Sequence, residues 1–249
     1  MTERFGLLDE ISYSQLKEVI KRYNSEPAFK EPNGDPLYLE TIKKRNVWDN
    51  LDRINVDDII NVVLNFLNKW KCRLSYRCAP ELQKALQETH ILFQLLKDEK
   101  LKIENVNFDE IVGTTGKSVK KIIKEIFNTI SIVKAGRKTV GFTATTKIMH
   151  MIIPNLFVMC DEKIREEYGC AGNSEGHLNF LCRMQKATQR IVREKTKVEI
   201  CKELHHGDRG FTKILDEYNY YTITWQQQKH TRTQNAKSIY ELHRMFISH

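Results

Sequence analysis

The residues of this chain whose types and spacing best suit chemistry are a lysine and an aspartate on either side of a turn. Lys147 falls near the start of a short apolar segment that we expect to be a helix, and Asp161 opens the next expected helix. Pro154 and Phe157 lie in the turn between them. An amine and a carboxylate held together in this way can carry out Schiff-base chemistry on a sugar. The same pattern also describes a surface lysine and an ordinary helix N-cap, so both interpretations stay open.

The elements that must position these two side chains are predicted to be helices, because apolar residues recur with helical spacing over most of the chain. We therefore expect a mostly α-helical fold. The expected helices cover residues 13–23, 56–70, 80–96, 117–132, 144–153, 162–169, 175–193, 198–206, 211–218 and 237–246. Their predicted N-caps include Asn55, Asp161 and Ser174, which have the short polar side chains that favour this position. Residues 24–36 are expected to form a loop, residues 101–106 a short strand or linker, and residues 220–225 a strand.

The amino-acid composition limits which class of protein this is and which partners it can bind. The chain has 249 residues, with 40 Lys and Arg against 32 Asp and Glu, which gives a net charge of +8. This excess favours polyanionic partners such as nucleic acid. No apolar run approaches the roughly 18 residues needed to cross a bilayer, and the first residues do not resemble a secretory signal. We expect an intracellular protein, cytoplasmic or nucleoid-associated, with no membrane partner.

The cysteines do not predict a cofactor or a metal site. The chain has 6 of them, and no two are spaced as Cys-x-x-Cys. Structural zinc and iron–sulfur clusters usually draw on such close pairs. We expect reduced and mostly buried thiols, and neither a bound metal nor another cofactor.

Basic residues gather in and after the expected helix at residues 117–132. Its apolar stripe would enter the core, while its lysines would lie on the opposite face. The following glycine-containing connection adds further positive charge, and each such side chain can neutralise one phosphate of a nucleic acid. A solvated helix face is the alternative. The candidate nucleic-acid-binding residues are Lys117, Lys120, Lys121, Lys124, Lys134, Arg137 and Lys138.

The order of these features resembles the helix-hairpin-helix DNA glycosylase superfamily, which includes endonuclease III-like and 8-oxoguanine glycosylases. A helix, a glycine-bearing turn, a helix with an early lysine and a turn ending in an aspartate follow each other within residues 117–169. Residues 141–147 stand where the hairpin of the family passes into its helix, and residues 160–165 stand at its aspartate motif. The paired hairpin glycines are missing, and Lys163 replaces the family's histidine. Lys138 matches the local Gly-x-Lys-Thr pattern better than Lys147, so it is the other candidate for the family lysine.

The resemblance implies a helical bundle that contains the hairpin, about residues 50–155, facing a second helical cluster of residues 1–49 plus 156–249. We expect one compact helical unit over residues 1–249, in which these two clusters would be interleaved subdomains. A cleft between the two clusters would bind double-stranded DNA. The implied activity is base excision by a glycosylase, with abasic-site lyase activity as an option. Lys147 would be the nucleophile, uncharged when it attacks, and Asp161 the activating carboxylate. The alternative is a non-catalytic helical protein that binds nucleic acid or another partner.

Overall fold

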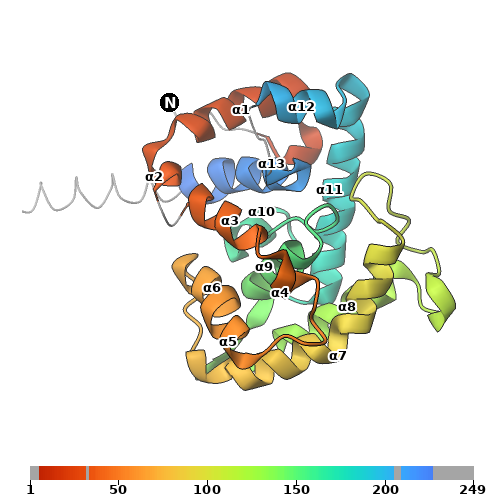
Figure 1. Ribbon diagram of the computed structural model, residues 1–249. Helices are drawn as coiled ribbons and strands as arrows, with labels where there is room; N and C mark the ends of the chain where they lie inside the picture. Colours follow the sequence, from red (N-terminus) through yellow and green to blue (C-terminus); the bar gives the residue numbers. More distant parts are fainter. Residues whose placement is uncertain (1–5, 32–33, 205–208, 227–249) are drawn as a thin grey trace, which may run out of the picture.

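The computed structural model describes residues 6–31, 34–204 and 209–226 (Figure 1). These residues form a mostly helical protein, which confirms the predicted fold class. The strands within the described ranges are two short antiparallel segments, β1 (Lys134–Ala135) and β2 (Lys138–Thr139), which make a small hairpin. Within the same ranges no helix combines the length and the apolar character that crossing a membrane requires.

The helices follow each other along most of the chain. The first half contains α1 (Tyr13–Ser25), α2 (Pro27–Lys30), α3 (Asp35–Ile42), α4 (Arg45–Trp48), α5 (Val56–Asp58), a π-helical stretch (Ile59–Leu64), α6 (Asn65–Lys69) and α7 (Ala79–Asp98). The second half contains α8 (Val119–Ser131), α9 (Gly141–Ile152), α10 (Glu162–Glu167), α11 (Ser174–Glu194), α12 (Lys197–Glu203), α13 (Phe211–Asn219) and a second π-helical stretch (Tyr220–Trp225).

Two of the three predicted N-caps are confirmed. The side chain of Asn55 accepts a hydrogen bond from the backbone N–H of Asp58, and Asp161 accepts one from Ile164. The third prediction is wrong by one residue, because Asn173 rather than Ser174 caps α11. Asn173 has the extended backbone that an N-cap requires, and its side chain accepts from the N–H of Gly176.

Residues 101–106 form a linker with a turn and no strand, which is one of the two predicted alternatives. Two other loop and strand predictions are wrong. Residues 24–36 contain α2 and the start of α3. Residues 220–225 continue α13 as a helix, although their aromatic and β-branched composition is typical of strands. Tertiary packing overrides that local preference, because the rings of Tyr220 and Trp225 pack against Phe29. The helix predicted at residues 237–246 lies outside the described residues.

Segments from both ends of the chain pack together. Figure 1 shows α1, α12 and α13 in one group, with α5, α6, α7 and α8 in another below it, and the contacts of α1 with α13 agree with this view. The long helix α11 joins the two, since it packs both on α8 and on the helical turn at Leu8–Glu10. One hydrophobic cluster extends from Leu8 to Ile223. The division into two interleaved subdomains stays a prediction.

A buried histidine in the core predicts acid sensitivity. Both ring nitrogens of His177 lack a hydrogen-bond partner within the described residues, and the ring packs among Phe127, Phe142 and Phe157. Burial lowers the pKa of His177 to about 3. As the pH falls below about 6.5, His177 takes up a proton in the unfolded state but not in the folded state. The free energy of unfolding therefore decreases by about 1.4 kcal/mol for each pH unit between about pH 6.5 and pH 3.

We expect His177→Leu to stabilise the protein by about 1–2 kcal/mol at pH 7, since it removes unsatisfied buried polar atoms. The gain should grow by about 1.4 kcal/mol for each pH unit below 6.5. Urea unfolding at several pH values measures this difference. Thr188→Val, at a buried position on the same helix, is the matched control and should differ from the wild type by the same amount at every pH. A pH-independent gain in His177→Leu would contradict the prediction.

Candidate functional site

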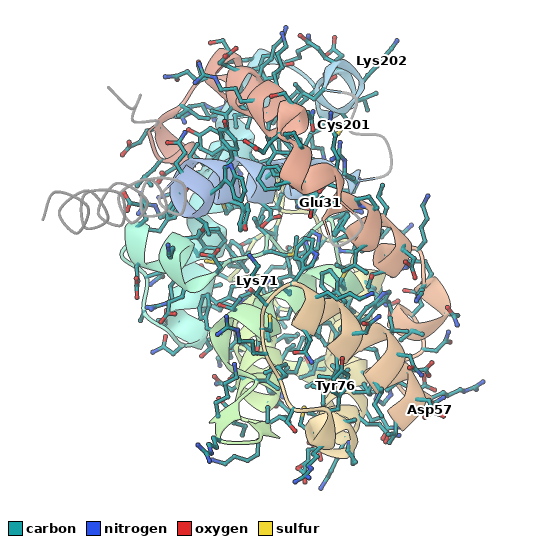
Figure 2. All side chains as sticks on the ribbon, turned by 90° about the vertical axis from the view of Figure 1, so that its left-hand side faces the viewer. Glu31, Asp57, Lys71, Tyr76, Cys201 and Lys202 are labelled. Atoms are coloured by element: carbon teal, nitrogen blue, oxygen red, sulfur yellow. The ribbon has the colours of Figure 1, made fainter. Side chains whose placement is uncertain are left out.

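A pocket of about 440 Å³ lies where the two ends of the chain meet the middle of the sequence. Figure 2 looks onto this side of the molecule, where the lining residue Glu31 lies above Lys71. The charged groups that line it include Lys147, Asp161, Lys213 and Asp216. Its walls are rich in aromatic rings, contributed by Tyr23, Phe29, Trp70, Tyr220 and Trp225. The pocket thus combines flat apolar surfaces with amine and carboxylate groups.

Lys147 reaches the pocket from the middle of α9. Its side chain is almost buried, with 9% of its surface exposed. The Nζ atom donates a hydrogen bond to the backbone oxygen of Trp70 at 3.1 Å and lies 3.7 Å from the Sγ atom of Cys72. It also lies 5.3 Å from the centre of the Trp70 ring, within the range of a cation–π contact. No carboxylate among the described residues lies within the 4.0 Å of an ion pair with Lys147.

Asp161 enters the pocket from the residue before α10, and both of its oxygens are held. Oδ1 accepts the capping hydrogen bond from Ile164 at 2.9 Å. Oδ2 accepts a hydrogen bond from the hydroxyl of Thr224 at 2.7 Å. Thr224 belongs to the π-helical stretch after α13, so the direction of this carboxylate depends on a segment far away in sequence. The sequence interpretation missed Thr224, because the hydrogen bond joins residues 63 positions apart.

The neighbours of Lys147 and Asp161 fasten the two segments to each other. The hydroxyl of Thr146 donates to the backbone oxygen of Cys160 at 3.0 Å and accepts from the backbone N–H of Cys160 at 3.2 Å. Both residues are fully buried. The structure thus places the predicted amine and the predicted carboxylate at the same pocket. Their catalytic roles stay a prediction.

A second lysine at the pocket was missed by the sequence interpretation. Lys213 is buried on α13, and its Nζ atom lies 2.8 Å from Asp216, 3.6 Å from Glu217 and 4.0 Å from Asp35. Burial alone would favour the neutral amine, but these carboxylates outweigh it and hold the pKa of Lys213 well above its usual value. Lys213 is therefore a permanent ammonium group, which suits it to charge stabilisation and not to nucleophilic attack.

This ammonium group is also enclosed by aromatic rings. The centres of the Tyr23, Tyr38 and Trp70 rings lie 5.9, 5.2 and 5.2 Å from the Nζ atom of Lys213. Arg209 completes the cluster with contacts to Asp35 at 2.7 Å and to Glu217 at 3.5 Å. The spacing of Lys213 to Asp216 and Glu217 is that of helix-surface ion pairs, so nothing in the sequence distinguishes this buried cluster from an exposed one.

The predicted phosphate-binding lysines within α8 and just before it are mostly paired with carboxylates. Lys117 lies 2.6 Å from Glu125, and the other pairs are Lys120 with Asp109 and Lys124 with Glu175. Lys121 is exposed on the same helix.

The predicted contacts in the hairpin are exposed. They are Lys134, Arg137 and Lys138, of which Lys138 donates a hydrogen bond from Nζ to the backbone oxygen of Cys72 at 2.6 Å. Lys138 is not among the residues that line the pocket, whereas Lys147 is. Binding of phosphate by any of these residues stays a prediction.

The cysteines are unpaired thiols. Cys78, Cys160 and Cys170 are buried, and Cys72, Cys182 and Cys201 are partly buried. In the ranges that the structure covers, no group of three or more His, Cys, Asp or Glu side chains is arranged to hold a metal ion.

A scan of protein-family models and searches of curated proteins and of solved structures found no match to this chain. What the structure defines is therefore a class: a mostly helical protein with an aromatic pocket that contains lysine and acidic side chains. The resemblance of residues 117–169 to helix-hairpin-helix glycosylases stays a prediction from the sequence.

Proposed function

We propose that this protein removes a base from DNA, with Lys147 as the attacking amine and Asp161 as the assisting carboxylate. The observation that carries the proposal is that both side chains line one pocket with aromatic walls. Ordinary surface residues at these two positions would not have converged there. Among the described residues no carboxylate forms an ion pair with Lys147, whereas Asp216 pairs with Lys213, so Lys147 is the better nucleophile of these two buried lysines.

The size and walls of the pocket support a nucleotide as its occupant. A volume of about 440 Å³ falls within the usual range of ligand pockets, roughly 300–1,000 Å³. Aromatic side chains such as Trp70 and Trp225 offer flat faces on which a base can stack. A base in duplex DNA must leave the stack to reach such a pocket, which costs a few kcal/mol. Stacking on the pocket walls would offset part of that cost.

In the proposed reaction, the lone pair of the Lys147 amine forms a bond to the sugar C1′ atom. The bond between C1′ and the base breaks, and its electron pair leaves with the base, which takes up a proton. Asp161 stabilises the positive charge that develops on the sugar. Loss of a proton from the nitrogen and opening of the sugar ring give a Schiff base between Lys147 and C1′. Removal of a proton from C2′ then expels the 3′-phosphate by β-elimination.

Reductive trapping tests the lyase step without knowledge of the damaged base. The wild-type protein is mixed with a duplex that contains a preformed abasic site, in the presence of sodium borohydride. We expect a covalent protein–DNA adduct on a denaturing gel and none with an undamaged duplex. No adduct with abasic-site DNA would overturn the lyase mechanism. Release of free bases from a panel of damaged duplexes, measured by mass spectrometry, tests the glycosylase step.

Thr224 is predicted to position Asp161. Thr224→Val removes the hydroxyl that donates to Oδ2 of Asp161, and we expect at least a tenfold slower trapping rate, since a hydrogen bond to a charged group contributes about 1.5–3 kcal/mol. Thr224→Ser keeps the hydroxyl and should restore most of the rate. Both variants should melt near the wild-type temperature and bind abasic-site DNA with unchanged affinity. Equal rates in the Val and Ser variants would remove Thr224 from this role.

A non-catalytic nucleic-acid-binding protein is the second candidate, and one observation favours it. The Nζ atom of Lys147 already donates to the backbone oxygen of Trp70 and contacts Cys72, as expected for a lysine with a structural role. Such a protein would bind DNA in a salt-dependent manner and form no trapped adduct.

A further inference from the structure

We infer that a nucleic-acid backbone is held mainly by two adjacent loops beside the pocket, and not by the lysine face of α8. The first loop covers residues 69–77 and the second is the β1–β2 hairpin; together we call them the two-loop surface. The inference deepens the proposed function, because it names the surface that would deliver a nucleotide to the pocket. Its basic residues are Lys69, Lys71, Arg73, Arg77, Lys134, Arg137 and Lys138.

The two loops form one continuous surface. Lys138 of the hairpin donates its hydrogen bond to Cys72 in the first loop. A Cβ atom placed on Gly136 would lie 3.5 Å from the Cβ of Ser75, so the tip of the hairpin touches the first loop. Lys69 and Lys71 also line the pocket. A strand that crosses these loops would therefore pass the mouth of the pocket.

The basic side chains of the two-loop surface are free to bind phosphate, whereas most lysines at α8 are paired with carboxylates. Neither loop contains an acidic residue. All of its basic side chains are exposed, and none forms an ion pair within 4.0 Å among the residues that the structure covers. At α8, Lys117 just before the helix and Lys120 and Lys124 within it each face a carboxylate. A phosphate there would have to displace or tolerate that carboxylate, while on the two-loop surface it would displace only counterions and water.

The first loop has an uncommon backbone conformation, in which its basic side chains are exposed. Lys71 and Arg73 have positive φ angles of 64° and 54°, which cost energy in residues other than glycine. The side chain of Asn68 sustains this shape, since it donates to the backbone oxygen of Leu74 at 2.9 Å and accepts from its N–H at 2.6 Å. Strained backbone of this kind persists where the surroundings fix it and is frequent at binding sites.

An exposed aromatic ring in the same loop points to nucleic acid as the occupant. Tyr76 is 49% exposed, and Figure 2 shows it on the same side of the molecule as Lys71. Phosphates on cationic side chains together with bases on exposed rings are the usual means of holding a strand without reading its sequence. The loop thus offers both contacts within a few residues of the pocket.

Fluorescence anisotropy with an undamaged labelled duplex, between 50 and 200 mM salt, tests the inference. The variants are a triple exchange in the first loop, Lys71→Gln with Arg73→Gln and Arg77→Gln, and a triple exchange on α8, Lys117→Gln with Lys120→Gln and Lys124→Gln. Both remove the same net charge. We expect the loop variant to lower the slope of log affinity against log salt by about 2–3 and the affinity at least tenfold, since each phosphate contact contributes about 0.9 to the slope.

The α8 variant should lower this slope by less than about 1, because its lysines already face carboxylates. Equal slopes in the two variants, or a larger loss in the α8 variant, would overturn the inference. Tyr76→Leu should weaken binding of a single strand about tenfold while leaving the slope unchanged, since it removes a ring on which a base can stack but no charge.

Undamaged DNA separates this inference from the proposed function, because no base is removed in the measurement. If the wild type binds and traps DNA but the loop variant binds normally, only the inference is wrong. If the wild type does not bind DNA at all, the inference and the proposed function both fail. Circular dichroism melting checks that the variants are folded, as expected because the exchanged side chains are exposed or half-buried.

Discussion

Exchange of Lys147 for Gln is expected to abolish the borohydride-trapped adduct with abasic-site DNA. Gln lacks the amine that must form the Schiff base, but it is polar and nearly as long as Lys, so it leaves a donor near the backbone oxygen of Trp70 that Lys147 contacts. The variant should therefore remain folded and still bind the DNA. Loss of a covalent nucleophile lowers a reaction by orders of magnitude, so the expected residual adduct is below detection.

Two further lysine variants make this result specific. Lys138→Gln removes the other lysine that could correspond to the catalytic lysine of the glycosylase family. At saturating DNA concentration this variant should still form the trapped adduct. Lys202→Gln changes an exposed residue on α12, distant from Lys71 in Figure 2, and should trap DNA as the wild type does. Loss of the adduct in Lys138→Gln together with its survival in Lys147→Gln would transfer the nucleophile to Lys138. Mass spectrometry of the digested adduct identifies the modified lysine directly.

The largest expected effect on stability belongs to Lys213. Lys213→Met keeps the length of the side chain but removes the charge that faces Asp216, Glu217 and Asp35. Arg209 would remain beside Asp35 and Glu217. Removal of one partner from a buried ion pair typically costs about 3–5 kcal/mol, because the other charge is left uncompensated. We expect a loss of this size in the free energy of unfolding, measured in urea at pH 7.5.

The pH dependence separates this charge effect from a packing effect. Burial already raises the pKa of Asp35 in the wild type, and loss of Lys213 should raise it further. As the pH falls toward 5, protonation of the folded carboxylates relieves their repulsion, so the difference between Lys213→Met and the wild type should shrink. Lys202→Met, at an exposed position, should cost well under 1 kcal/mol. A difference for Lys213→Met that stays the same from pH 8 to pH 5 would indicate lost packing and not lost charge.

Local sequence determined the elements that carry the predicted site. The apolar stripe of α8, the capping side chains of Asn55 and Asp161, and the short apolar helix with Lys147 depend on interactions between residues a few positions apart. Such interactions can be recognised in a single sequence because helical geometry fixes which neighbours meet. The convergence of Lys147 and Asp161 at one pocket was expected only through the family resemblance.

Tertiary structure alone decided what surrounds these residues. The burial of Lys213, the hydrogen bond from Thr224 to Asp161 and the helical state of residues 220–225 all depend on contacts between distant segments. The same holds for the carboxylates that pair with the lysines of α8, since Asp109 and Glu175 lie outside that helix. A helical repeat tells which face of a segment is polar, but it does not tell what lies opposite that face. Burial and charge pairing depend on packing. Packing results from many weak contacts between residues far apart in the sequence, and no local sequence pattern predicts these contacts.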